Sequence, residues 1–162
     1  MNLGEHSYFL GIDKGPNTTI GKYCSIAVGT YIHSFDNHAC ITNRKLVSTY
    51  DFGEWGVDFT RSGWSKGDVK IGNDVWMGED VQILTGVTIG DGVIVGAHTV
   101  IGKDVPPYAV IVGNPYIIKR YRYSDEIIKK LLEIKWWDWD NRKINERLAS
   151  FIDIDEFIKL YG

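Results

Sequence analysis

Apolar residues between Val69 and Val105 recur at every sixth position. One column holds Ile71, Met77, Ile83, Ile89, Val95 and Ile101, and a second lies two residues earlier, at Val69, Val75, Val81, Val87 and Val93. Glycine follows each residue of the first column, except at Leu84. A period of six fits neither a helix face, near 3.6 residues, nor a simple alternating strand. It is typical of a β-solenoid, in which each short strand contributes an inward side chain before the chain turns a corner.

The same register begins earlier, at Ile20, Ile26 and Ile32, and then stops. Because 39 positions separate Ile32 from Ile71, which is not a multiple of six, the chain must leave the solenoid and return out of phase. The excursion, residues 34–68, is long and rich in aromatic residues. Loops of this length are uncommon unless they are functional or disordered, and disordered segments are poor in aromatics. We therefore predict an ordered active-site loop.

The remaining segments predict a lead-in and a helical tail. Residues 1–16 suggest a short irregular or strand-like lead-in. The hexads over 18–35 predict one coil and those over 69–104 predict two more, which makes three coils in all. Pro106-Pro107 should end the register, since proline cannot donate to a strand ladder, and residues 108–112 add one strand. Ser124 is placed to cap a helix, and two more helices are expected over 140–151 and 153–161. We expect domain boundaries of 1–122 for the solenoid with loop 34–68, and 123–162 for a tail that covers an open end or edge.

Composition is that of an ordinary globular chain. The 162 residues are 44% hydrophobic and 24% charged, with a net charge of −3, which gives no reason to expect a nucleic-acid partner. Two cysteines in a chain of this length do not make a disulfide framework, and Cys24 fits a small buried position. The sequence has neither a membrane-spanning apolar run nor an N-terminal signal pattern, so we expect a cytoplasmic protein.

Histidines are the natural candidates for acid–base chemistry, and the chain has four: His6, His33, His38 and His98. His38 stands near the start of the excursion. His33 occupies a register position and is expected to be structural, while His6 and His98 are expected at the surface. The spacing of His33 and His38 is not that of a ligand pair and no cysteine or carboxylate set completes it, so we expect no catalytic metal.

Several motifs narrow the family. They are Ile71-Gly-Asn-Asp-Val-Trp-Met-Gly78, Val87-Thr-Ile-Gly-Asp-Gly92, Val112-Gly-Asn-Pro115, Lys135-Trp-Trp-Asp-Trp139, and Asn37-His38 upstream of Ser48-Thr-Tyr-Asp-Phe52. With these, the chain resembles the hexapeptide-repeat acyltransferases, and within them it is similar to the xenobiotic acetyltransferases that modify chloramphenicol and streptogramins. The resemblance implies an all-β solenoid fold: a left-handed parallel β-helix of hexapeptide repeats with a long excursion loop and a C-terminal α-helical tail.

The same resemblance implies the site. His38 would be the general base of a direct acetyl transfer from acetyl-CoA, with Asp36 or Asn37 orienting its ring and Trp76 beside the site. The acceptor-binding residues would be Tyr50, Phe52 and Trp55. The expected acetyl-CoA-binding residues are Gly78, Gly96, Ala97, Thr99, Lys103, Asn114, Pro115 and Arg120. The resemblance also implies a homotrimer with active sites between subunits.

The acceptor is less well defined than the donor. We expect O-acetylation of an antibiotic or a sugar, although the short N-terminal segment and Asp51, where antibiotic-modifying relatives commonly have proline, depart from the antibiotic pattern. The alternatives are N-acetylation of an amino sugar, free or nucleotide-linked, and a non-catalytic hexapeptide-repeat protein with a binding or structural role. A β-helix carbonic anhydrase would need three zinc-binding histidines across the coils, a set that these four do not supply convincingly.

Overall fold

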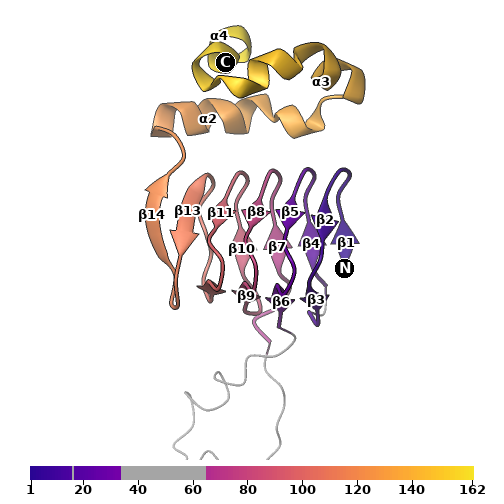
Figure 1. Ribbon diagram of the computed structural model, residues 1–162, viewed down its shortest axis with the longest axis vertical. Coiled ribbons are helices and arrows are strands. Elements are labelled where there is room, and N and C mark those ends of the chain that lie inside the picture. The colour runs from indigo at the N-terminus through magenta and orange to yellow at the C-terminus, as the bar shows by residue number, and fades with distance from the viewer. Residues whose placement is uncertain (16, 34–64) are drawn as a thin grey trace, which may run out of the picture.

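The computed structural model describes residues 1–15, 17–33 and 65–162. Twelve strands of two residues each wind through four successive coils (Figure 1). They are, coil by coil, β1 (Asn2–Leu3), β2 (Tyr8–Phe9) and β3 (Ile12–Asp13); β4 (Thr19–Ile20), β5 (Ser25–Ile26) and β6 (Tyr31–Ile32); β7 (Lys70–Ile71), β8 (Trp76–Met77) and β9 (Gln82–Ile83); and β10 (Thr88–Ile89), β11 (Ile94–Val95) and β12 (Val100–Ile101).

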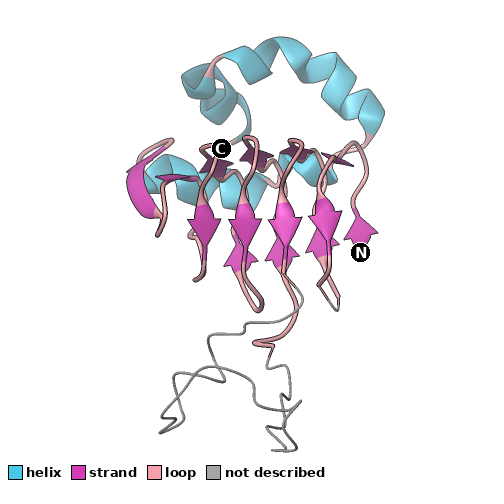
Figure 2. Cartoon of the chain, turned by 60° about the horizontal axis from the view of Figure 1, so that its bottom comes forward, coloured by secondary structure: helices cyan, strands magenta, loops and turns pink. Residues whose placement is uncertain are grey.

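Equivalent strands of successive coils pair in parallel and form three sheets, seen from another side in Figure 2. The first sheet is β1-β4-β7-β10, the third is β3-β6-β9-β12, and the second begins β2-β5-β8-β11. Ile20 pairs with Ile71, and Ile71 with Ile89, so the chain after the excursion resumes on the next coil. The predicted solenoid, a left-handed β-helix of hexapeptide repeats, is confirmed.

Both predicted apolar columns are buried. Residues of the first column are at most 4% exposed and the valines two places earlier at most 2%. Cys24 occupies the second column as a buried free thiol, as expected. Gly72, Gly78 and Gly90 are needed because the backbones of neighbouring coils approach closely: a Cβ at Gly72 would lie 2.7 Å from the Asp91 amide nitrogen. Left-handed backbone occurs two residues further on, for example at Asp74 (φ 54°).

The lead-in is a full coil, so the structure has four coils where the hexads predicted three. Leu3 pairs with Ile20, Phe9 with Ile26, and Asp13 with Ile32. The spacing from Leu3 to Phe9 is six residues but that from Phe9 to Asp13 is four, and the last residue is charged. The hydrophobic period is therefore too irregular to show this coil in the sequence.

The regular six-residue register ends near the proline pair, as predicted, but the winding continues: stacked partners are 18 residues apart from Ile71 to Ile89 and 16 apart from Ile89 to Val105. Val105 bridges to Ile89, and β13 (Ala109–Val112) pairs in parallel with β11 through Val110 and Ile111. The prolines fall between these two contacts, at a corner, where no ladder donor is required. A strand that was not predicted, β14 (Ile117–Tyr121), pairs antiparallel with β13 and forms the edge of the second sheet.

The tail forms α2 (Asp125–Ile134), η2 (Trp136–Asp138), α3 (Asn141–Arg147), η3 (Leu148–Ile152) and α4 (Ile154–Tyr161). The Ser124 hydroxyl accepts a hydrogen bond from the Ile127 amide and caps α2, as predicted. The tail was expected over an open end or edge, and this is wrong. It lies along the turns that join the first sheet to the second, here called the first corner, whereas β14 covers the edge (Figure 1).

Candidate functional site

The excursion leaves the solenoid from the third sheet. His33 follows β6, and its Nε2 lies 3.0 Å from Oε1 of Gln82 on the next coil. The ring of Tyr31 meets the His33 ring edge-on, with centroids 4.7 Å apart. Tyr31 and Gln82 are direct ladder partners. The outer face of the third sheet therefore holds the His33 side chain in place at the last residue before the excursion.

The returning end is fixed to the turn between the third and first sheets. The Lys66 amide donates to Thr85 Oγ1 at 3.1 Å, and the Gly86 amide donates to the Gly67 carbonyl at 2.9 Å. A Cβ on Gly86 would come within 2.5 Å of the Lys66 side chain, and its φ is 71°, so glycine is required there. Both described ends of the excursion are thus tied to one side of the solenoid.

The predicted loop residues lie outside the described part of the chain. They are the proposed base His38, its neighbours Asp36 and Asn37, and the acceptor-side residues Tyr50, Phe52 and Trp55. Their roles remain predictions from the sequence.

Four of the predicted cofactor residues, Gly78, Gly96, Ala97 and Thr99, lie at the turns between the second and third sheets, here called the second corner. A Cβ on Gly78 would lie 2.8 Å from the Ala97 amide nitrogen on the next coil. Thr99 is buried; its hydroxyl donates to the Gly96 carbonyl at 2.7 Å and accepts from the Gly113 amide at 3.1 Å, which fixes the turn before Asn114. Ala97 is exposed and Gly96 is partly exposed at this corner, whereas Gly78 and Thr99 are buried.

Pro115 and Lys103 are brought together by a residue that the sequence did not single out. Asn114 and Pro115 are joined by a cis peptide bond, and Tyr116 follows them with its side chain buried. The Tyr116 hydroxyl donates to the Asp104 carbonyl at 2.6 Å, and Lys103 Nζ lies 5.2 Å from the centre of its ring. The sequence signal that could have identified Tyr116 is its position as an aromatic residue directly after Asn-Pro.

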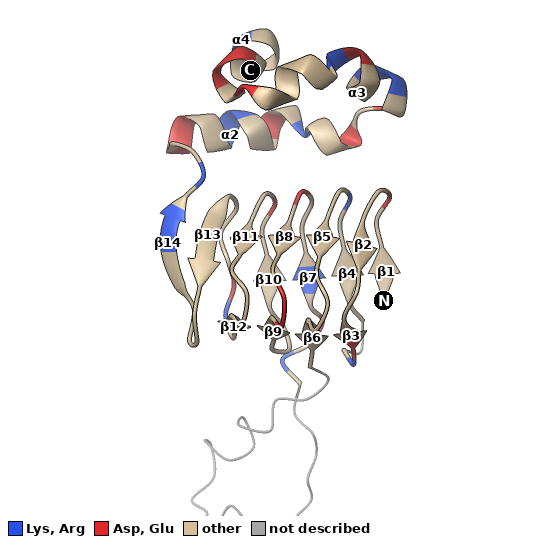
Figure 3. Cartoon of the chain, viewed as in Figure 1, with Lys and Arg blue, Asp and Glu red and all other residues tan. Residues whose placement is uncertain are grey.

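Trp76 and Arg120 share the outer face of the second sheet. Trp76 is half exposed, and the ladder runs from Trp76 through Ile94 and Val110 to Arg120. The exposed strand β14 carries Arg120 and is marked by a basic patch in Figure 3. Ile117 on β14 is also largely exposed. This face combines apolar side chains with cations, a composition typical of a surface that another molecule covers.

Two predicted surface histidines are exposed, and each has a contact. His98 Nδ1 lies 3.6 Å from Asp80 Oδ2 at the second corner. His6 Nε2 lies 3.1 Å from Asn141 Oδ1 at the first corner. Among the described residues, no group of three or more histidines, cysteines or carboxylates could hold a metal ion. In the same part of the chain, no helix has the length and apolar character needed to cross a membrane.

Comparison with known proteins extends this picture. Residues 68–103 match the family model for bacterial transferase hexapeptide (six repeats). A probable macrolide acetyltransferase of Lysinibacillus sphaericus is 38% identical over 99% of this chain and 91% of its own length. A chloramphenicol acetyltransferase of Escherichia coli is 43% identical over 91% of this chain and 80% of its own.

A solved structure also matches. It is a hexapeptide-repeat-containing acetyltransferase from Vibrio cholerae in complex with acetyl-CoA, with a TM-score of 0.58 and 26% identity over 75% of this chain. The match covers 60% of the Vibrio chain, so this chain spans about three fifths of it.

Proposed function

The chain belongs to the hexapeptide-repeat acetyltransferases, with chloramphenicol and macrolide acetyltransferases among its relatives; it uses acetyl-CoA as donor, and we propose that it acetylates a hydroxyl group of a small molecule. The likeness to the macrolide acetyltransferase carries this proposal, because it extends over 99% of the chain and so includes the excursion as well as the repeats. The repeats alone specify a scaffold, and fold alone does not fix an acceptor.

In the proposed mechanism His38 removes the proton of the acceptor hydroxyl as its oxygen attacks the thioester carbonyl. The new C–O bond forms as the C–S bond breaks, and the imidazolium returns its proton to the departing CoA thiolate. Imidazole suits both transfers because its pKa lies near neutrality. Asp36 or Asn37 orients the ring through the second nitrogen. Transfer is direct, without an acyl-enzyme.

Acetyl-CoA is proposed to lie along the second corner. Gly78, Gly96 and Ala97 keep this corner narrow enough for backbone groups to meet the pantetheine amides, and Thr99 holds the turn that leads to Asn114 and Pro115. Lys103 and Arg120 supply positive charge for the nucleotide phosphates. The ammonium of Lys103 is exposed and is oriented over the Tyr116 ring, 5.2 Å from its centre.

The acceptor is proposed to be an antibiotic or a sugar bound by the excursion, with Tyr50, Phe52 and Trp55 supplying apolar contacts. The printed names of the relatives, macrolide and chloramphenicol acetyltransferases, support an antibiotic. We further propose a homotrimer with each site between two subunits. The half-exposed Trp76 and the exposed Ile117 on one sheet face support such an interface.

An acceptor screen with acetyl-CoA tests this function. The panel contains a macrolide, chloramphenicol, streptogramin A, simple sugars and nucleotide-linked amino sugars, and release of the CoA thiol is followed with a thiol reagent. We expect transfer to a hydroxyl acceptor, and we expect His38→Ala to lower its rate by about 100-fold or more. His6→Ala, an exposed histidine at the first corner, is the matched control and should retain the rate. Full activity of His38→Ala would refute the mechanism, and transfer to amines alone would refute the acceptor class.

A further inference from the structure

The repeat is broken at two positions, and both lie on the third sheet. The residue after each member of the first apolar column is glycine or alanine throughout the hexads, except at His33 and Leu84. These two residues follow β6 and β9, which are neighbours in the sheet, and the His33 amide donates to the Ile83 carbonyl at 2.9 Å. Large side chains therefore replace glycine on two successive coils, at one place on the surface of the solenoid.

The winding of the coils does not impose these two side chains. On the next coil the same position is Gly102, and a Cβ there would meet only the end of the Leu84 side chain, at 3.2 Å. At Gly72 and Gly78, by contrast, a Cβ would lie within 2.8 Å of backbone on the next coil. Because the close approach that demands glycine elsewhere is absent here, the presence of a histidine and a leucine calls for another reason.

His33 and Gln82 present complementary polar atoms on this part of the sheet. Gln82 Oε1 lies 3.0 Å from His33 Nε2 and can only accept, so Nε2 carries the ring proton and Nδ1 of the neutral ring is an acceptor. The Gln82 amide nitrogen is a donor, and among the described residues neither it nor His33 Nδ1 has a hydrogen-bond partner. A donor and an acceptor held in one hydrogen-bonded pair match a hydroxyl group, which both accepts and donates.

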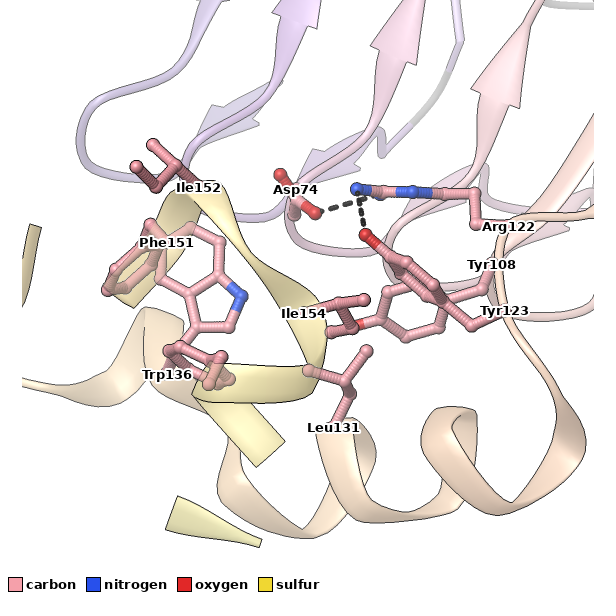
Figure 4. A pocket seen from close by; sticks show the side chains of 10 residues that line it. Asp74, Tyr108, Arg122, Tyr123, Leu131, Trp136, Phe151, Ile152 and Ile154 are labelled. Carbon is pink, nitrogen blue, oxygen red and sulfur yellow. Dashed lines mark hydrogen bonds and ion pairs between the residues drawn. The ribbon is translucent and has the colours of Figure 1, made fainter. Parts of the chain in front are cut away.

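The polar side chains of the first corner differ, because they satisfy one another. Arg122 Nη1 lies 3.0 Å from Asp74 Oδ2 (Figure 4) and also donates to the Gly92 carbonyl at 2.8 Å. That pair is matched within the protein and joins the corner to the segment after β14. The His33–Gln82 pair instead keeps a donor and an acceptor available to a ligand.

The third sheet also lies where an acceptor has to bind. It joins the second corner, where acetyl-CoA is proposed to lie, to the turn at which the excursion leaves and returns. Tyr31 contributes an aromatic ring that meets the His33 ring edge-on, with centroids 4.7 Å apart, and it is the ladder partner of Gln82. These three side chains and Leu84 are all partly exposed. A molecule on this face would lie between the donor corner and the excursion.

We propose that Tyr31, His33, Gln82 and Leu84 form part of the acceptor site and select an acceptor that carries a ring and a second hydroxyl besides the one that is acetylated. His33 Nδ1 accepts from this second hydroxyl and the Gln82 amide donates to its oxygen. Tyr31 and Leu84 contact the ring. The inference rests on the proposed function, because it names the feature by which that reaction selects its acceptor. The substrate class is therefore a ring-bearing diol.

Chloramphenicol is a suitable probe because it carries a nitrophenyl ring, a primary hydroxyl for transfer and a secondary hydroxyl nearby. Its analogue without the secondary hydroxyl is the matched ligand control, and affinities are measured by ligand-observed NMR on the full chain. Gln82→Met and His33→Phe keep side chains of similar size but remove the polar atoms. Each should weaken chloramphenicol binding by about 5-fold, the equivalent of one neutral hydrogen bond, and leave binding of the analogue unchanged.

Two further variants separate recognition from structure. Leu84→Ala should weaken both ligands alike, because its contact is with the ring. Lys70→Met, at an exposed position of β7 on the first sheet, is the control and should change neither affinity. All four variants should keep the urea midpoint and the elution volume of the wild type. Dissociation of the assembly by Gln82→Met would show that this face is a subunit contact, which would overturn the inference.

Steady-state kinetics distinguish this inference from the proposed function. Gln82→Met should raise KM for chloramphenicol by about 5-fold and leave KM for acetyl-CoA unchanged. Acetyl transfer with an unchanged KM in that variant, no binding of chloramphenicol, or equal losses for the analogue would overturn the inference and leave the proposed transfer standing. Binding that depends on Gln82, without transfer to any acceptor of the panel, would instead refute the proposed function.

Discussion

Replacing Arg122 by methionine tests how the tail is attached to the solenoid. The variant keeps an unbranched side chain of similar length but removes the guanidinium, and with it the contact to Asp74 at 3.0 Å and the bond to the Gly92 carbonyl at 2.8 Å. Asp74 remains at the corner, beneath the tail. We expect this substitution to lower the free energy of unfolding.

The magnitude follows from burial. Breaking a fully buried ion pair costs about 3–5 kcal/mol, while an exposed pair contributes about 0–1 kcal/mol. The side chains of Arg122 and Asp74 are 23% and 28% exposed, which places them between these limits but nearer to the buried case. We therefore expect a loss of about 2–3 kcal/mol at neutral pH.

The cost should depend on pH with a defined sign. Burial raises the pKa of Asp74, and the nearby Arg122 opposes that rise. Without Arg122 the pKa in the folded state rises further above its unfolded value, so stability is retained below the unfolded pKa and is lost as pH rises through the folded one. The difference between variant and wild type should thus be smallest near pH 4, where the loss of the bond to the Gly92 carbonyl remains, and largest at pH 7. Urea unfolding at fixed protein concentration, followed by circular dichroism and tryptophan fluorescence, measures it.

Two further variants complete the test. Asp74→Asn in the Arg122→Met background removes the uncompensated carboxylate and should recover about 1–2 kcal/mol. Lys22→Met is the control: it breaks the exposed pair to Asp138, which lies at 3.1 Å between solenoid and tail, and should cost at most about 0.5 kcal/mol. Equal losses for Lys22→Met and Arg122→Met, or a loss that does not vary with pH, would refute the reasoning.

Two other predictions concern packing and ionisation. Gly78→Val should lower stability by about 1–3 kcal/mol in urea unfolding, because its Cβ would lie 2.8 Å from a backbone nitrogen of the next coil; Gly102→Ala, which meets only the end of a leucine side chain at 3.2 Å, should cost less, and the reverse order would contradict the close-approach argument. Wild-type stability should fall above about pH 10 by up to 1.4 kcal/mol per pH unit, because the folded state keeps Tyr108 protonated while the unfolded state ionises. Tyr108→Phe should lose that contribution, and identical alkaline slopes for both proteins would show that Tyr108 ionises freely in the fold.

Regular repeats made most of the fold predictable from sequence. Each six-residue repeat carries the same apolar pattern, so Ile71 and Val95 could be assigned to the core from the repeat alone. The first coil could not be found this way, because its inward positions are Leu3, Phe9 and Asp13. Asp13 is tolerated there because its carboxylate accepts hydrogen bonds from the Gly15 amide and the Thr18 hydroxyl.

The candidate site was only partly predictable for a related reason. The small residues of the second corner follow the repeat, so their clustering follows from the period together with the family resemblance. Contacts between segments that are distant in the sequence leave no such periodic pattern in it. Tyr116 reaches Asp104 across 12 residues, and Arg122 reaches Asp74 across 48. The second of these contacts ties the segment after β14 to the first corner, and periodicity carries no information about it.

Arg120 and Arg122 are two residues apart in the sequence, but we expect them to have different roles in different parts of the molecule. Arg120 lies on the exposed outer face of β14, in the same ladder row as Trp76, where we propose that it meets a CoA phosphate. Arg122 follows the end of β14 at the first corner, where its amide donates to the Tyr108 carbonyl at 2.8 Å and its side chain joins the tail to Asp74.

The two substitutions should therefore separate binding from stability. Arg120→Met should raise KM for acetyl-CoA several-fold, as expected for one lost charge-assisted hydrogen bond, and leave the urea midpoint unchanged. Arg122→Met should lower the midpoint and leave that KM unchanged under conditions where the protein is folded. If both variants changed KM alike, the tail would have to contribute to the donor site, and the assignment of the two corners to separate tasks would be wrong.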